Sequence, residues 1–162
     1  MAEASGDGLG VVVRVIDGDT IDVTVGGREE RVRLIGIDAP ESVARDTPDQ
    51  CFGAEASAAL KALLTEGTPV LLERDAETRD RYGRLLAYVH RSDDSLFVNQ
   101  WLLDGGFADA LFFEPNTAFR DELTEARDRA RESGAGLWSV CTGPDQPLDT
   151  LGGPASDQGT SR

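Results

Sequence analysis

The stretch TIDVTVGGREERVRLIGI, residues 20–37, carries the pattern that decides the fold. Residues 20–25 alternate apolar and polar side chains, which is the period of a half-buried strand. The glycine pair 26–27 is a hairpin signal, and residues 28–37 return as the partner strand. The β-branched run at 11–16 precedes them, so the sequence predicts a meander of three strands.

The rest of the chain adds helices and a second pair of strands. Helices are predicted at 53–67, 97–106 and 117–132, and strands at 69–74 and 84–90. Gly67 and Gly134 are expected to end the first and last helices. A meander, a helix and a strand pair are typical of a small Greek-key barrel. The predicted fold class is therefore α+β, a five-stranded OB-fold barrel with three helices.

Length and charge limit the organisation and the partners. The chain has 162 residues and a net charge of -14, which suits one soluble domain and argues by itself against a polyanionic partner. We expect a flexible N-terminus at 1–10, one domain at 11–141 and a disordered tail at 142–162. No apolar run is long enough to span a membrane, and the first ten residues do not resemble a signal peptide.

Five charged residues lie at strand ends or inside strands. They are Asp19, Arg33, Asp38, Glu41 and Arg84. Paired carboxylates suit a hard cation such as calcium, and a further carboxylate can deprotonate a water molecule. Arginine forks bind phosphate oxygens and stabilise charge that develops during transfer. Together these are the parts of a metal-assisted phosphodiesterase.

Each of these parts also has a purely structural interpretation. The DGDT segment at 17–20 suits a turn, the DAPE segment at 38–41 suits a helix start, and Arg33 can pair with a surface glutamate. In an ideal strand Arg33 and Asp38 face opposite sides. The enzymatic interpretation therefore requires a bulge or bend at Gly36.

Five motifs in order resemble the staphylococcal nuclease family, also called thermonucleases. They are VIDGDTIDV, RLIGIDAPE, FGAEAS, RDRYGRLLAYV and GAGLW, and they span about Val11 to Trp138. The resemblance implies a five-stranded OB-fold barrel with three helices. It also implies a calcium-dependent endonuclease that cleaves DNA and RNA and leaves 3′-phosphates.

The resemblance implies a role for each site residue. Asp19, Asp38 and the backbone carbonyl of Ala39 would bind Ca²⁺, and Glu41 would handle the attacking water. Arg33 and Arg84 would hold the scissile phosphate. Arg81 and Tyr82 would lie near the terminal phosphate of a bound nucleotide. The best-known family member has threonine at the position of Ala39, is strongly basic, and has a stacking tyrosine where this chain has Leu111 or Phe113.

Two other functions remain open beside the nuclease. One is a catalytically inactive OB-fold module that binds nucleic acid or protein, and the other is an extracellular calcium-binding structural protein. Retention of Arg33 and Arg84 favours the enzyme. As a nuclease, the protein would act on DNA and RNA, with single strands preferred, as a monomer. It would be secreted or at the cell surface, with any signal peptide absent from this chain.

Two further expectations concern the cysteines and the arginines. Cys51 and Cys141 bracket the domain of an exported family, which predicts a disulfide, with two buried free thiols as the alternative. Seven arginines in or near the site strands predict a locally positive face on an acidic body: Arg28, Arg31, Arg33, Arg74, Arg79, Arg81 and Arg84.

Overall fold

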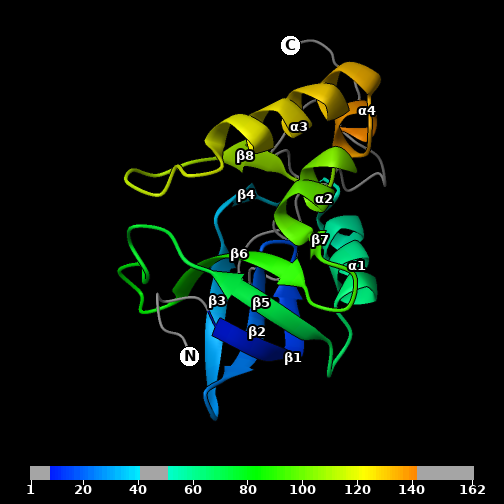
Figure 1. The fold of residues 1–162 in the computed structure, drawn as a ribbon. Helices are drawn as coiled ribbons and strands as arrows, with labels where there is room; N and C mark the ends of the chain where they lie inside the picture. Colours follow the sequence, from blue (N-terminus) through cyan, green and yellow to red (C-terminus); the bar gives the residue numbers. More distant parts are fainter. Residues whose placement is uncertain (1–7, 41–50, 142–162) are drawn as a thin grey trace.

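A closed β-barrel forms the lower half of the molecule and supports a layer of helices (Figure 1). The computed structural model describes residues 8–40 and 51–141. Its elements are β1 (Gly8–Asp17), β2 (Thr20–Val25), β3 (Arg28–Leu34), β4 (Gly36–Asp38), α1 (Gly53–Leu63), β5 (Pro69–Glu73), β6 (Leu85–Arg91), β7 (Leu96–Phe97), α2 (Val98–Asp104), β8 (Asp109–Leu111), α3 (Arg120–Ser133) and α4 (Leu137–Val140).

The barrel is closed by a parallel pairing between its first hairpin and its last. The sheet runs in the order β3-β2-β1-β5-β6, and β3 also pairs with β6. Along β3 the side chains of Val32 and Leu34 are buried, whereas those of the alternate residues Arg31 and Arg33 are exposed and half-buried. This period of two fills the barrel with apolar side chains and sets charged ones on its wall. The predicted OB-fold barrel is confirmed.

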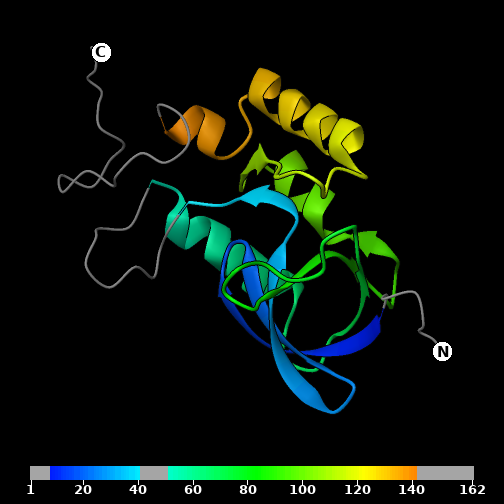
Figure 2. The ribbon, with the colours of Figure 1, turned by 90° about the vertical axis from the view of Figure 1, so that its left-hand side faces the viewer.

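The helix α1 lies beside the barrel against β1, α2 packs on β6, and α3 lies above α2 and β8 (Figures 1 and 2). The long helix α3 buries Leu123, Ala126 and Ala130, which lie on one face at helical spacing. It ends where predicted, at Gly134, whose φ of 73° is a left-handed cap. No helix in the described ranges is long and apolar enough to cross a membrane.

The structure corrects several predicted boundaries. The first helix ends at Leu63 rather than near Gly67, because Leu64 leaves helical geometry and is buried. The first strand begins at Gly8, so the last three residues of the predicted flexible segment 1–10 are paired. A fourth, short helix (α4) was not predicted. The remainder of the N-terminus, the segment 41–50 and the tail 142–162 lie outside the described residues.

The two cysteines meet as predicted. The sulfur atoms of Cys51 and Cys141 lie 2.08 Å apart, at bonding distance, and join the start of α1 to the end of α4. They form a second, small apolar cluster with Leu137, against which Phe52 and Trp138 pack.

Candidate active site

The turn between β1 and β2 meets the chain that leaves β4. Asp19 lies in this turn with only 7% of its surface exposed. One oxygen of its carboxylate, Oδ2, accepts the backbone N–H of Ala39 at 3.1 Å, and the other, Oδ1, accepts the hydroxyl of Thr20 at 2.9 Å. The carboxylate is therefore held beside Ala39, the residue directly after Asp38.

Arg33 lies beside this turn because it pairs with Thr20 across the β2–β3 ladder, and a bend after β3 returns the following chain to the same place. Gly36 has a φ of +81°, which ends the strand and starts β4 in a new direction against β8. The buried amide of Asn99 donates to the carbonyl of Ile35 at 2.8 Å and accepts the N–H of Val89 at 2.8 Å, which fixes the bend to β6. The bend at Gly36 that the enzymatic interpretation requires is present, whereas the single strand predicted over residues 28–37 is wrong.

The guanidinium of Arg33 is held by the backbone at this bend. Its Nη1 donates to the carbonyls of Leu34 at 2.9 Å and Ile37 at 2.6 Å. Its Nη2 lies 3.5 Å from Oδ2 of Asp19. Arg33 and Asp19 thus share one end of the barrel, although strand alternation alone would separate Arg33 from Asp38.

Arg84 enters the same region from the neighbouring strand. β3 and β6 are parallel, and Arg33 is in register with Leu86, two residues after Arg84. Asp80 accepts the Nε of Arg84 at 2.8 Å and its backbone N–H at 3.0 Å. Burial would raise the pKa of Asp80, but these bonds and the charge of Arg84 lower it overall, so the carboxylate stays ionised.

A tyrosine completes the arginine side of the site. Tyr82 is 69% exposed, and the guanidinium carbons of Arg81 and Arg84 lie 5.0 and 5.4 Å from its ring centroid. Its hydroxyl accepts a hydrogen bond from Arg81 at 2.9 Å. Stacking of this kind limits the rotation of both guanidinium groups.

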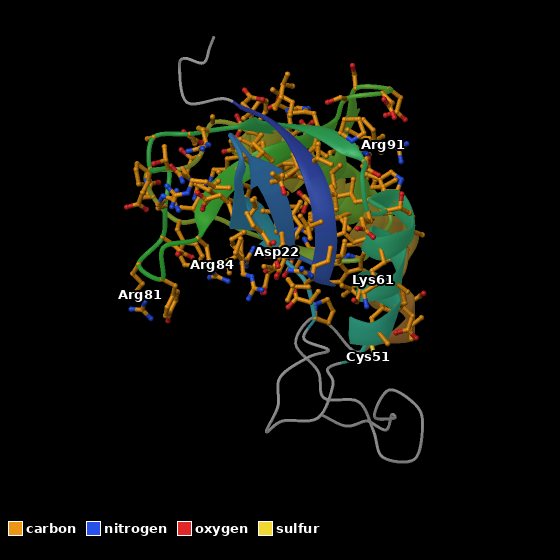
Figure 3. All side chains as sticks on the ribbon, turned by 90° about the horizontal axis from the view of Figure 1, so that it is seen from below. Asp22, Cys51, Lys61, Arg81, Arg84 and Arg91 are labelled. Atoms are coloured by element: carbon orange, nitrogen blue, oxygen red, sulfur yellow. A yellow bond between two sulfur atoms is a disulfide. The ribbon has the colours of Figure 1, made fainter. Side chains whose placement is uncertain are left out.

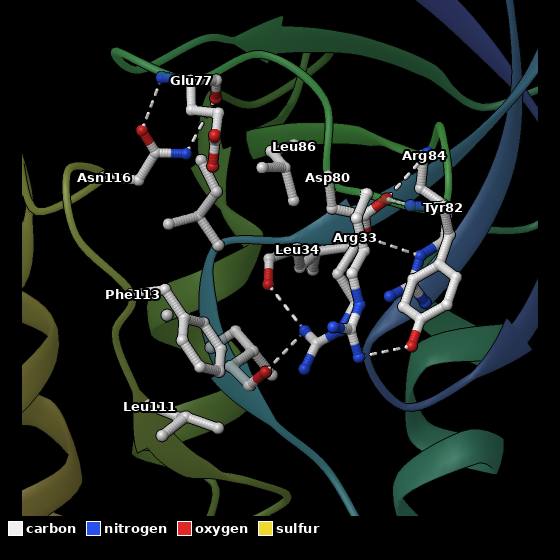
Figure 4. Close-up of a pocket in the computed structure, with 14 residues that line it drawn as sticks. Arg33, Leu34, Glu77, Asp80, Tyr82, Arg84, Leu86, Leu111, Phe113 and Asn116 are labelled. Carbon is white, nitrogen blue, oxygen red and sulfur yellow. Dashed lines mark hydrogen bonds and ion pairs between the residues drawn. The ribbon is translucent and has the colours of Figure 1, made fainter.

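These residues line a pocket of about 610 Å³ (Figure 4). Arg33, Arg84 and Tyr82 lie on one side of it, and the apolar residues Leu111 and Phe113 lie on the other. Phe113 is 68% exposed, as expected of a side chain that borders an open site. One wall can therefore bind an anion and the other a flat apolar group.

Several arginines of the predicted positive face are paired with carboxylates. Within the described ranges at least four of the seven have a carboxylate partner within 3.5 Å: Arg31 with Asp22, Arg33 with Asp19, Arg79 with Glu30 and Arg84 with Asp80. Figure 3 shows Arg81 and Arg84 together on one side of the barrel, with Lys61 and Arg91 on the other. At the pocket, the carboxylates of Asp19 and Asp80 lie against the guanidinium groups of Arg33 and Arg84 and offset part of their charge.

The oxygen donors suit a hard cation. The carboxylate of Asp19 lies at the backbone of Ala39, and the carboxylate of Asp38 directly precedes it along the chain. Carboxylate and carbonyl oxygens are the ligands that calcium takes in proteins. The described residues hold no cluster of three or more His, Cys, Asp or Glu side chains that could bind a metal by themselves. Glu41 lies outside the described residues.

Comparisons with known proteins identify the family. The profile of the family described as "Staphylococcal nuclease homologue" matches residues 31–140. The chain belongs to the staphylococcal nuclease family. It is 41% identical over 128 residues to the thermonuclease of Staphylococcus hyicus, a match that covers 79% of this chain and 74% of the relative.

Two further family relatives come from other species. The thermonuclease of Staphylococcus intermedius is 44% identical over 128 residues, with 79% of this chain and 74% of the relative covered. Endonuclease YncB of Bacillus subtilis (strain 168) is 36% identical over 127 residues, with 78% of this chain and 59% of the relative covered.

Two site residues were missed by the sequence analysis. Asp80 orients Arg84, and the only signal was a carboxylate four residues before an arginine in a charged segment. Asn116, which lines the pocket, bonds to Glu77, 39 residues away, so no local pattern could reveal it.

Proposed function

We propose that this protein is a calcium-dependent nuclease that hydrolyses phosphodiester bonds in DNA and RNA. The observation that supports it most directly is the convergence of Arg33 and Arg84, from adjacent parallel strands, on one pocket beside Asp19. Membership of the staphylococcal nuclease family and relatives named as a thermonuclease and an endonuclease support the same activity.

The two arginines would bind the scissile phosphate in different ways. Nε of Arg84 is taken by Asp80, and within the described residues no hydrogen bond is found for its two Nη groups, which can bind phosphate oxygens. In Arg33, Nη1 donates hydrogen bonds to two backbone carbonyls, and Nη2 lies beside the carboxylate of Asp19. As negative charge develops on the phosphoryl oxygens, these fixed donors stabilise it without reorganisation.

Glu41 would complete the reaction as the general base. It lies three residues after Asp38, and its role rests on the family motif. Glu41 would take a proton from water as the water oxygen bonds to phosphorus, and the bond from phosphorus to the 5′ oxygen would break. The 5′ oxygen would leave with a proton from solvent, so the products are a 3′-phosphate and a 5′-hydroxyl.

Asp19, Asp38 and the carbonyl of Ala39 would hold calcium, with the fit described above. Bound calcium would supply positive charge next to the phosphate. We also propose a secreted or surface-exposed monomer with a preference for single strands; the paired cysteines favour an oxidising compartment.

Digestion assays test the proposal. Plasmid DNA, a single-stranded oligonucleotide and an RNA are incubated with the protein in calcium and in chelator, and the product ends are analysed. We expect cleavage in the calcium samples and none in the chelator samples, and we expect the products to carry 3′-phosphate ends. Binding of the oligonucleotide without cleavage in calcium would favour the inactive binding module instead.

A further inference from the structure

A buried asparagine fastens the two sides of the pocket to each other. Asn116 is 4% exposed and lies between β8 and α3. Its Oδ1 accepts the backbone N–H of Glu77 at 2.7 Å, and its Nδ2 donates to the carbonyl of the same residue at 2.8 Å (Figure 4). One side chain thereby satisfies both backbone groups of a residue in the loop between β5 and β6, which is otherwise a segment without helix or extended strand.

A second connection joins the same two segments. The Oδ2 of Asp75 accepts the hydroxyl of Tyr88 at 2.6 Å and the backbone N–H of Ala118 at 3.0 Å. Tyr88 is fully buried in β6, so this contact ties the base of the loop to the barrel. The Asn116 contact lies further along the loop, nearer to the residues that face the pocket.

The joined segments carry opposite walls of the pocket. The β5–β6 loop carries Arg81, Tyr82 and Arg84, and the chain before Asn116 carries Phe113. Glu77 itself lines the pocket, so fixing its backbone fixes the position of this part of the pocket wall. A shift of about 1 Å in such groups can cost up to ~100-fold in rate.

We propose that Asn116 is a positioning residue that sets the separation of the two pocket walls and thereby places Arg84 against the phosphate. The catalytic consequence rests on the proposed nuclease function, whereas the effect on the pocket does not. If Asn116 has only a structural role, its substitution lowers stability and leaves the kinetic constants of the folded protein unchanged. If Asn116 positions the pocket walls, its substitution changes those constants while the protein is still folded.

Three variants of the full chain separate these roles. Asn116→Ala removes both bonds to Glu77. Asn116→Asp keeps the acceptor for the N–H of Glu77 but sets a carboxylate oxygen against its carbonyl. The control, Val25→Ala, trims a side chain packed against the core at the far end of the β2–β3 hairpin, away from the pocket.

Three measurements are made at a temperature where every variant is folded: amide hydrogen exchange at Glu77, kcat and KM on a single-stranded oligonucleotide in calcium, and affinity for that oligonucleotide in chelator. We expect Asn116→Ala to speed exchange at Glu77 and to lower kcat/KM by about 10- to 100-fold. Asn116→Asp should lower kcat/KM at least as far, because two acceptor oxygens then face each other at a buried site. Val25→Ala should stay within about twofold of wild type in kcat/KM, as expected for a site remote from the pocket.

The outcomes distinguish this inference from the proposed function. If wild type cleaves and Asn116→Ala matches Val25→Ala in kcat/KM, Asn116 is not a positioning residue. If wild type binds the oligonucleotide but does not cleave it, the nuclease proposal fails, and a loss of affinity in Asn116→Ala still supports the positioning role in the pocket. Unchanged exchange at Glu77 in Asn116→Ala overturns the inference in either case.

Discussion

Removing the bond between Cys51 and Cys141 should destabilise the protein strongly, because the two residues are 90 positions apart in the chain. We consider the double variant Cys51→Ser/Cys141→Ser. In the chain-entropy model a closed loop of this length lowers the entropy of the unfolded chain by ~15 cal/mol/K, which is about 4.6 kcal/mol of stability at 25 °C. Both residues are buried, so the serine hydroxyls would add to the loss unless they find partners.

Equilibrium unfolding in urea measures this difference. Oxidised wild type, wild type reduced with dithiothreitol, and the double serine variant are compared at pH 7. We expect a fall in the free energy of unfolding of about 4–5 kcal/mol for the reduced and serine forms, since both lose the cross-link. With a slope of ~2 kcal/mol/M, the midpoint should fall by roughly 2 M.

Mass spectrometry after alkylation without reductant supplies the covalent control. Two alkylated thiols in the folded protein would refute the bond. A fall of less than about 1 kcal/mol in both cross-link-free forms would refute the entropic argument instead, because loop closure would then contribute little.

Four further outcomes follow from the site. Glu41→Gln should lower kcat by ~10²–10⁴ in calcium while the protein stays folded, since it removes the proposed base. Arg84→Ala should lower kcat by a comparable factor, because it removes hydrogen-bond donors to the charge that develops on the phosphoryl oxygens. Turnover near that of wild type in either variant contradicts the assigned role. Gly36→Ala should lower the free energy of unfolding by ~2–4 kcal/mol in urea, because the new Cβ would lie 2.8 Å from the ring of Phe112 at a φ of +81°; a change below about 0.5 kcal/mol would show that the bend relaxes. Burial tends to raise the pKa of Asp75, but hydrogen bonds from Tyr88, Ala118 and Ala76 lower it below the ordinary 3.8, so its stabilising contribution is present above that pH and is lost as the pH falls below it. An Asp75→Asn variant whose stability falls with pH in parallel with wild type below pH 4 would contradict this assignment.

The sequence predicted the elements whose signals are local. Alternating side chains at 20–25 and a glycine pair marked the first hairpin, and helical spacing with Gly134 marked α3. The enzymatic interpretation also required a bend at Gly36, because an unbroken strand would place Arg33 and Asp38 on opposite faces, and the bend is present.

Other features depend on contacts that the sequence does not display. The first helix ends at Leu63 because the next residue turns into the core, and no glycine or proline marks that position. The pairing of β4 with β8 involves three residues on each side, too few to show periodicity. The sequence also does not show which carboxylates the arginines meet. Arg79 bonds to Glu30, 49 positions away, and only the closed barrel brings the two together.

The parallel ladder between β3 and β6 determines when a newly folding chain can first form the pocket that Arg33 and Arg84 line. It joins Val32 to Leu85, 53 positions apart in the chain, whereas the β2–β3 hairpin needs only a two-residue turn. Contacts this distant in sequence must overcome more chain entropy, and they form late. A folding intermediate with an open seam would hold Arg33 and Arg84 near opposite edges of one open sheet, too far apart to line one pocket. During refolding, activity should therefore return with seam closure and lag behind the signal from hairpin formation.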